Sequence, residues 1–159
     1  MTVTEAQVVT PEGLVPGREC GECDVCCSIL KRDKSGRKQA GDADCPHHIP
    51  GKGCAIYDTR PASCRAWHCA WRRFGWLPDE CRPDHLGVML TVEERDEEST
   101  APERCFVLGR AIEDESAYKT LLARDVFWSL MHEVPVWVEI GNQRLQYGGP
   151  QKFIDPRFL

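Results

Sequence analysis

Hydrophobic residues are distributed unevenly along this 159-residue chain. Between positions 18 and 75 only nine of 58 residues are large apolar ones, whereas between 84 and 147 the same residue types make up 24 of 64. Ordering one residue costs roughly 1.5 kcal/mol, and burial of apolar surface returns about 25 cal/mol per Å². The second stretch can therefore bury a conventional core, whereas the first stretch needs another source of stability.

The second stretch predicts an α+β lobe with a short antiparallel sheet and one main helix. Its β-prone apolar runs predict strands at 86–94, 105–108, 134–140 and 145–147. An acidic loop is expected at 94–100, and Gly141-Asn142 is typical of a closing hairpin. The main helix is predicted over 115–131 with Asp114 as its cap. One helix face is expected to carry Tyr118, Leu121, Leu122, Val126, Trp128 and Met131.

Three segments follow from this pattern. Residues 1–17 are expected to form a flexible leader, and residues 82–159 form the α+β lobe. Residues 18–81 contain frequent Gly and Pro, which favour short helical turns, one of them starting near Cys23. We expect this segment to be a small irregular cysteine-rich lobe, stabilised by metal, with the α+β lobe packed on it.

The N-terminal residues and the charge narrow the partners and the compartment. Residues 1–17 lack a basic region followed by an apolar run, and no segment approaches the roughly 20 apolar residues of a spanning helix. We therefore expect a cytoplasmic protein with no membrane contact. The net charge of −5 divides into +4 for residues 18–76, −7 for 77–159 and −2 for the leader. We interpret +4 as an ordinary solvated surface, so a protein partner is expected rather than nucleic acid.

Eight of the ten cysteines lie in the apolar-poor stretch. In a reducing compartment, closely spaced cysteines usually indicate metal binding or redox chemistry rather than disulfides. The first four form C-x2-C-x2-C-C, in which soft thiolates select zinc, copper(I) or iron–sulfur clusters. The eight predicted metal ligands are Cys20, Cys23, Cys26, Cys27, Cys45, Cys54, Cys64 and Cys69. Weaker candidates are Cys81 and His68, followed by His47 and His48.

The adjacent pair Cys26-Cys27 indicates more than one metal position. Neighbouring side chains diverge in a helix or a strand, so their sulfurs seldom bind the same single ion. Eight thiols are enough for two four-ligand sites or for one multinuclear centre. Arg60 and Arg65 are candidates to donate hydrogen bonds to the sulfurs, whereas Arg72 and Arg73 are interpreted as surface residues. A dry cover over the metal is expected from Trp67, Trp71 and Phe74.

The identity of the metal depends on the cysteine spacing. The intervals of nine, ten and five residues from Cys45 to Cys69 do not match the paired C-x2-C knuckles of common zinc modules. The C-x2-C-x2-C run with a remote Cys-Pro is similar to the ferredoxin pattern, which favours an iron–sulfur cluster of the 4Fe-4S type, with zinc as the alternative. Cys105, within an apolar run, is expected to be a small buried hydrophobic residue.

The ordered landmarks CGECDVCC, CPHH, GCAIYDTRPASCR and HCAW resemble the YkgJ-type cysteine-cluster family, which is described as zinc- or iron-chelating. The resemblance spans about residues 20–71 and implies metal binding through the eight cysteines named above. Its framework positions fall on Tyr57, Arg60, Pro61 and Arg65. The family often has glycine between its early cysteines, whereas this chain has Asp24 and Val25 between Cys23 and Cys26. Similar segments occur in flagellin lysine methylases, which suggests association with modifying enzymes.

The sequence leaves three functions open. The chain could be an iron–sulfur module that serves a partner enzyme in electron transfer or as a cofactor carrier. It could be a structural zinc module without catalysis that binds a partner, or a metal sensor or buffer. No phosphate-binding G-x4-G-K-[ST], dinucleotide G-x-G-x2-G, esterase G-x-S-x-G or H-E-x2-H motif is present, so no catalytic residue is predicted.

Overall fold

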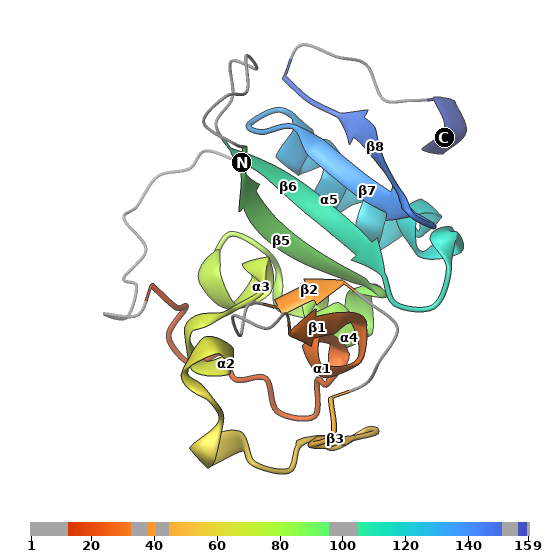
Figure 1. Cartoon of the computed structure of the whole chain (residues 1–159). Helices are drawn as coiled ribbons and strands as arrows, with labels where there is room; N and C mark the ends of the chain where they lie inside the picture. Colours follow the sequence, from red (N-terminus) through yellow and green to blue (C-terminus); the bar gives the residue numbers. More distant parts are fainter. Residues whose placement is uncertain (1–12, 33–37, 41–44, 96–104, 151–155, 159) are drawn as a thin grey trace. The chain divides into compact units, whose positions relative to one another are not determined.

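The computed structural model describes residues 13–32, 38–40, 45–95, 105–150 and 156–158 (Figure 1). The fold is α+β, as predicted, and the chain divides into two compact units, Met1–Asp79 and Glu80–Leu159. This division falls beside the predicted boundary at Cys81. Most of the predicted leader lies outside the described residues, but Val15 donates its backbone N–H to the Arg72 carbonyl at 2.8 Å. The end of the leader is therefore bound to the first unit.

The first unit consists of short elements, as its Gly- and Pro-rich sequence predicts. They are α1 (Val25–Ile29), β1 (Leu30–Arg32), β2 (Lys38–Ala40), β3 (His48–Ile49), β4 (Gly53–Cys54), η1 (Tyr57–Thr59), α2 (Ala62–Ala66) and α3 (Ala70–Arg73). The strands form two separate antiparallel pairs, β1 with β2 and β3 with β4. The turn between β3 and β4 needs Gly51, whose φ of +71° is unfavourable for residues with a side chain.

The second unit is built on one four-stranded sheet. Its elements are α4 (Pro83–Leu86), β5 (Val88–Glu94), β6 (Cys105–Ala111), η3 (Glu115–Lys119), α5 (Leu121–Met131), β7 (Val136–Ile140), β8 (Gln143–Gly148) and η4 (Pro156–Phe158), and η2 (Asp79–Cys81) spans the division. The strand order is β5-β6-β7-β8, and β6 pairs with β7 in parallel. The expected purely antiparallel sheet is therefore wrong at this pair. The cause is α5, because a helical crossover returns the chain to start the next strand in the same direction.

The predicted single helix over 115–131 is interrupted. Asp114 caps η3 as expected, accepting the Ser116 N–H at 2.7 Å. The chain then becomes extended at Thr120, whose hydroxyl accepts the Ala123 N–H at 3.2 Å and starts α5. This break shifts the phase of the helix, which explains why the predicted face was partly wrong. Leu121 and Trp128 are exposed by 79% and 55%, and the buried residues of α5 are Ala123, Val126, Phe127, Leu130 and Met131.

Helix α5 packs against one face of the sheet (Figure 1). Gly109 of β6 permits this close approach, because a Cβ there would lie 3.2 Å from Val88 Cγ1 and 3.3 Å from Phe127 Cζ. Phe127 also meets Tyr147 edge-on, with ring centroids 4.8 Å apart. The apolar strand positions and the buried residues of α5 thus form the conventional core that the composition of this stretch predicts.

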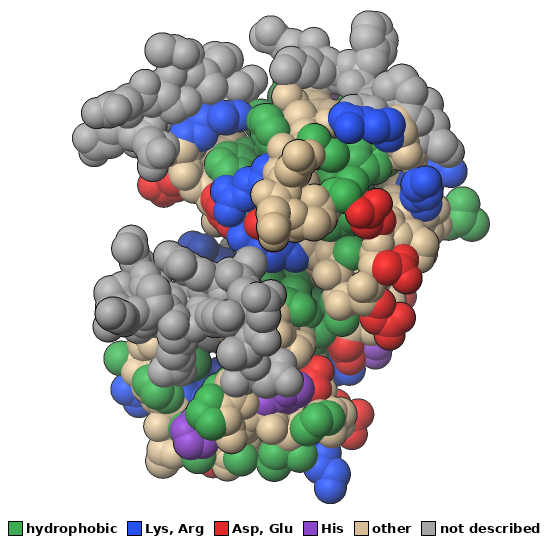
Figure 2. Space-filling view, turned by 45° about the vertical axis from the view of Figure 1, so that its right-hand side comes forward, with side chains coloured by type: hydrophobic (Ala, Val, Ile, Leu, Met, Phe, Trp, Pro, Cys, Tyr) green, Lys and Arg blue, Asp and Glu red, His purple; other side chains and the backbone are tan. Residues whose placement is uncertain are grey.

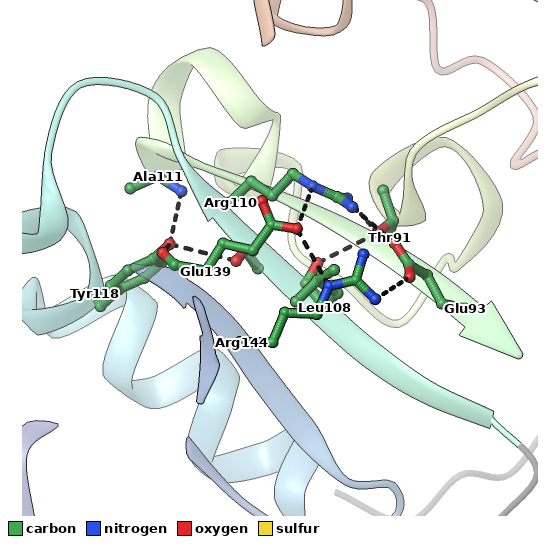
Figure 3. A network of polar contacts seen from close by, with 9 residues as sticks. Thr91, Glu93, Leu108, Arg110, Ala111, Tyr118, Glu139 and Arg144 are labelled. Carbon is green, nitrogen blue, oxygen red and sulfur yellow. Dashed lines mark hydrogen bonds and ion pairs between the residues drawn. The ribbon is translucent and has the colours of Figure 1, made fainter. Parts of the chain in front are cut away.

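A network of charged side chains covers the opposite face of the sheet and joins all four strands (Figure 3). Arg110 is only 8% exposed and donates to Thr91 Oγ1 at 3.0 Å, Glu93 Oε1 at 2.9 Å and Glu139 Oε1 at 3.1 Å. Arg144 of β8 contacts the same two carboxylates at 3.2 and 3.4 Å. Two guanidinium groups thus share two carboxylates, which balances the charge on this face.

Tyr118 joins η3 to the ends of β6 and β7 (Figure 3). Its hydroxyl donates to the Glu139 carbonyl at 2.6 Å and accepts the Ala111 N–H at 2.9 Å. The pKa of Tyr118 is raised to about 12, mainly by burial, with the nearby Glu139 and Glu115 acting in the same direction and the Ala111 N–H in the opposite one. The hydroxyl therefore stays protonated at neutral pH and holds this corner together.

Among the described residues, no helix is both long enough and apolar enough to cross a bilayer.

Candidate metal centre

One cavity in the first unit is lined by seven of the eight cysteines predicted as ligands. The seven are Cys20, Cys23, Cys26, Cys27, Cys45, Cys54 and Cys64. The cavity has a volume of about 50 Å³ and is completed by Gly21, His47, Ile56, Tyr57, Arg60 and Pro61. The eighth predicted ligand, Cys69, is buried and does not line the cavity. Residues separated by more than forty positions are thus assembled around one space.

The CGECDVCC run reaches the cavity through a tight turn followed by a short helix. Cys23 donates its N–H to the Cys20 carbonyl at 2.9 Å, which closes the turn. Helix α1 follows, and Cys27 donates to the Asp24 carbonyl at 2.9 Å. Cys26 and Cys27 are adjacent on α1, and both line the cavity. The tight turn and the short helix together bring four thiols of one short run to a single cavity.

The later cysteines are attached to this run by backbone hydrogen bonds. Cys45 donates its N–H to the Cys27 carbonyl at 3.3 Å, which places the two residues side by side. Cys54 lies opposite His48 in the β3–β4 pair. Cys64 lies in α2, with its N–H on the Pro61 carbonyl at 2.9 Å. These bonds depend on the fold, so spacing in the sequence could not predict them.

Asp24 makes contacts that the sequence did not indicate. Its carboxylate accepts His48 Nε2 at 2.7 Å and the Gly51 N–H at 2.9 Å. Burial would raise the pKa of Asp24, but the hydrogen bonds from His48 and Gly51 outweigh it and lower that pKa below its ordinary value. Asp24 thus fastens the start of α1 to the β3–β4 hairpin. The family that the chain resembles often has glycine between its early cysteines. The presence of Asp24 there was the one sign in the sequence that this residue has a role of its own.

Arg18 is a second residue that sequence reasoning missed. Its side chain is only 9% exposed, and Nη1 donates to the carbonyls of Trp71 at 2.6 Å and Phe74 at 3.1 Å. Nη2 donates to the Leu77 carbonyl, and the guanidinium lies over the Trp71 ring, 4.9 Å from its centroid. Arg18 thus connects the chain just before Cys20 to the segment that follows Cys69, the last of the eight predicted ligands.

Cys69 is the most deeply buried of the eight predicted ligands. Its pKa is raised to about 11, mainly by burial, and negative charge at Cys20 and Cys26 acts in the same direction. The backbone N–H groups of Arg72 and Trp71 act in the opposite direction, because they donate hydrogen bonds to the Cys69 sulfur. Without metal, Cys69 is therefore a protonated thiol at neutral pH. Its interaction with Cys20 and Cys26 places it beside the cavity-lining group.

Tyr57 and Arg60, two framework residues of the family resemblance, line the cavity together. The Arg60 guanidinium stacks 3.7 Å from the Tyr57 ring centroid, and its Nε donates to the Tyr57 carbonyl at 2.8 Å. Burial raises the pKa of Tyr57, as does the Cys20 sulfur, which also accepts a hydrogen bond from the hydroxyl. Arg65, the other framework arginine considered as a sulfur donor, is exposed and lies outside the cavity lining.

The weaker candidates have different positions. His47 lines the cavity, whereas His48 is held by Asp24. His68 is not part of the lining, and its pKa is lowered by burial and by the positive charge of Arg72 and Arg60. Cys81 is buried at the start of the second unit, outside the cavity lining. The buried position expected for Cys105 is wrong, because the first residue of β6 is exposed.

The proposed cover of aromatic residues is present only in part. Trp71 is buried, but Trp67 and Phe74 are partly exposed, and Phe74 stacks on Trp76 with centroids 6.1 Å apart. On the visible face of the first unit, hydrophobic side chains are interspersed with histidine and polar groups (Figure 2). Arg72, interpreted from the sequence as a surface residue, has its Nε and Nη1 atoms buried. Arg72 is thus only partly a surface residue, whereas Arg73 is exposed as expected.

The chemistry of the donor set fits a thiolate-bound metal group. All ten cysteines lie within the described residues, and each is a thiol rather than half of a disulfide. Across those residues, however, no three Cys, His, Asp or Glu side chains are arranged to hold a single metal ion. The thiols surround a space instead of converging on one point.

No family model matches the chain, and neither a curated protein nor a solved structure is significantly similar to it. Membership of the YkgJ-type family therefore stays a prediction from the cysteine landmarks.

Proposed function

We propose that this protein carries a multinuclear thiolate-bound metal centre, an iron–sulfur cluster, as a redox or cofactor-bearing module for a partner enzyme. The observation that carries the proposal is the single cavity lined by seven cysteines, with Cys69 buried beside them. Thiolates are the ligands that iron–sulfur clusters require, and such a cluster supplies one-electron transfer when bound. Cysteines drawn from a turn, α1, the β3–β4 pair and α2 would hold it.

The arrangement of the thiols favours a group larger than one ion. Zinc binds sulfur at about 2.3 Å, so the ligands of a tetrahedral site lie about 3.8 Å from one another. Among the described residues, no three Cys, His, Asp or Glu side chains lie close enough together to bind one ion in this way. The cavity of about 50 Å³ compares with about 10–15 Å³ for one water-sized atom, which leaves room for several atoms. A cluster of metal and sulfide atoms uses such a space better than a single ion does.

A structural zinc module is the second candidate, and the small core of the first unit favours it. Buried hydrophobic residues of that unit, among those described, are Val25, Leu30, Cys69, Ala70, Trp71 and Leu77. The apparent binding free energy of a structural zinc ion is about 10–16 kcal/mol, which is enough to stabilise a unit whose hydrophobic core is this small. Both candidates require the same thiols, so they differ in the metal and in the redox chemistry.

Anaerobic purification followed by metal, acid-labile sulfide and visible-absorption measurements tests the proposal. Iron and acid-labile sulfide in comparable amounts, with broad visible absorption from sulfur-to-iron charge transfer, would support it. A colourless protein with stoichiometric zinc would overturn the cluster in favour of the structural ion. A protein that retains no metal would overturn both.

Two cysteine variants show whether the cavity is the site. Cys45→Ser alters a thiol of the cavity lining, whereas Cys105→Ser alters an exposed thiol of the second unit. We expect Cys45→Ser to lose metal and Cys105→Ser to retain it. Equal metal content in the two variants would contradict the assignment of the cavity.

A further inference from the structure

Helix α3 carries three buried N–H groups that have no acceptor among the described residues. They belong to Trp71 Nε1, Arg72 Nε and Arg72 Nη1. A buried polar group without a hydrogen bond destabilises the folded state, and a buried charge without a counter-charge does so more strongly. Two buried N–H groups of the Arg72 guanidinium therefore lack a hydrogen-bond acceptor among the described residues, and an anion at this place would satisfy them.

The carboxylates of the first unit do not provide that partner. Its five described acidic residues are Glu19, Glu22, Asp24, Asp58 and Asp79. Asp24 is bound by His48 and Gly51, and Asp79 accepts a hydrogen bond from Arg18. The other three carboxylates are exposed to solvent. Among the described residues of the first unit, the cysteine cluster is the remaining group that can supply concentrated negative charge.

Arg72 lies beside that cluster. It follows Cys69 by one turn of chain, and its backbone N–H donates to the Cys69 sulfur. Its positive charge acts on the hydroxyl of Tyr57, which lines the cavity and donates a hydrogen bond to Cys20. The same charge acts on His68. Arg72 is thus attached to the buried cysteine through its backbone, with its N–H 3.1 Å from the Cys69 carbonyl, and its charge acts on a residue that lines the cavity.

We propose that Arg72 is a positioning residue whose partly buried guanidinium is the counter-charge of the thiolate-bound centre. The inference rests on the proposed function, because the thiols become a concentrated negative charge only when they bind metal. Metal binding would then supply the anion that Arg72 lacks, and Arg72 would retain the metal and favour the more negative, reduced form of a redox centre. Outer residues of this kind typically change metal affinity by about 10–100-fold.

The test compares Arg72→Met and Arg72→Lys with Arg73→Met, which removes the same charge from the exposed neighbour on α3. The protein is purified anaerobically with its native metal, and release to a chelator and the reduction potential are both measured. We expect Arg72→Met to release metal about 10–100-fold faster and to have a lower potential. Arg72→Lys should recover most of both properties, and Arg73→Met should match the wild type.

The outcomes separate this inference from the proposed function. Equal release rates for Arg72→Met and Arg73→Met in a metal-loaded protein would overturn the role of Arg72 and leave the proposed centre intact. A defect in Arg72→Lys as large as in Arg72→Met, with an unchanged potential, would indicate packing alone and would also overturn it. A wild type without metal would overturn the proposed function and this inference together. If the bound metal is zinc, which has no redox chemistry, the rate of metal release alone tests the role of Arg72.

Discussion

Arg18 provides the sharpest test of how the first unit holds its cysteines together. Arg18→Lys keeps the positive charge but removes the planar guanidinium that reaches the carbonyls of Trp71, Phe74 and Leu77. A lysine ammonium can satisfy one of these acceptors well, because its three N–H groups share one nitrogen and cannot span the three carbonyls as the guanidinium does. The others lose a charged donor in a site where the native side chain is only 9% exposed.

The expected loss follows from these contacts. A hydrogen bond to a charged group contributes about 1.5–3 kcal/mol, so losing one to two of them costs about 1.5–6 kcal/mol. The ion pair with Asp79 adds little, because the carboxylate is 85% exposed and surface pairs contribute about 0–1 kcal/mol. Asp79→Asn is therefore the matched control, with an expected loss below about 0.5 kcal/mol.

Native-state hydrogen exchange measures the effect where it arises. The amides of Phe74 and Leu77 are hydrogen-bonded within the segment that Arg18 holds, so their opening free energies should fall by the same amount in Arg18→Lys, about 1.5–6 kcal/mol. Metal retention should fall as well, because Arg18 ties the entry to Cys20 to the segment after Cys69. A change within about 0.5 kcal/mol, or an equal effect of Asp79→Asn, would refute the reasoning.

Two further predictions concern hydrogen bonds in each unit. Asp24→Ala should lower the opening free energy at the Gly51 amide by about 1 kcal/mol, because His48 and Gly51 lose their acceptor; unchanged hydrogen exchange there would contradict this. Tyr118→Phe leaves the Ala111 N–H without its acceptor and should cost about 1–3 kcal/mol in urea unfolding at neutral pH. The Tyr118 pKa is raised from 10.0 to about 12, so the contribution of its hydroxyl is present below pH 10 and declines as the pH rises toward 12. The difference in stability between wild type and Tyr118→Phe should therefore shrink over that range, and a constant difference would contradict the reasoning.

The second unit could be predicted largely from local sequence. The apolar runs gave the strands β5 to β8, and Gly141-Asn142 gave the final hairpin. The break at Thr120 was missed, because the apolar positions on both sides of it suit a continuous helix. The parallel pairing of β6 with β7 was missed because it depends on where the crossover helix packs, which is a tertiary property.

The candidate site was predictable in composition but not in geometry. Clustered cysteines indicated the ligands, and the structure brings seven of them to one cavity. The supporting contacts of Arg18 and Asp24 join residues between 24 and 61 positions apart, and no periodic pattern marks such pairs. The burial of Arg72 was also invisible, because an arginine in a charged run usually faces solvent.

The charged network on the sheet also restricts which strand alignments the second unit can adopt. A shift of β6 by one residue would turn Arg110 toward α5 and bring Gly109 to the charged face, because side chains alternate along a strand. Glu93 and Glu139 would then share only the half-exposed Arg144, and a cation would enter the apolar core. Misaligned sheets are therefore penalised on both faces at once. The unit that contains the longer strands thus has a built-in check on pairing errors during folding, independent of any metal.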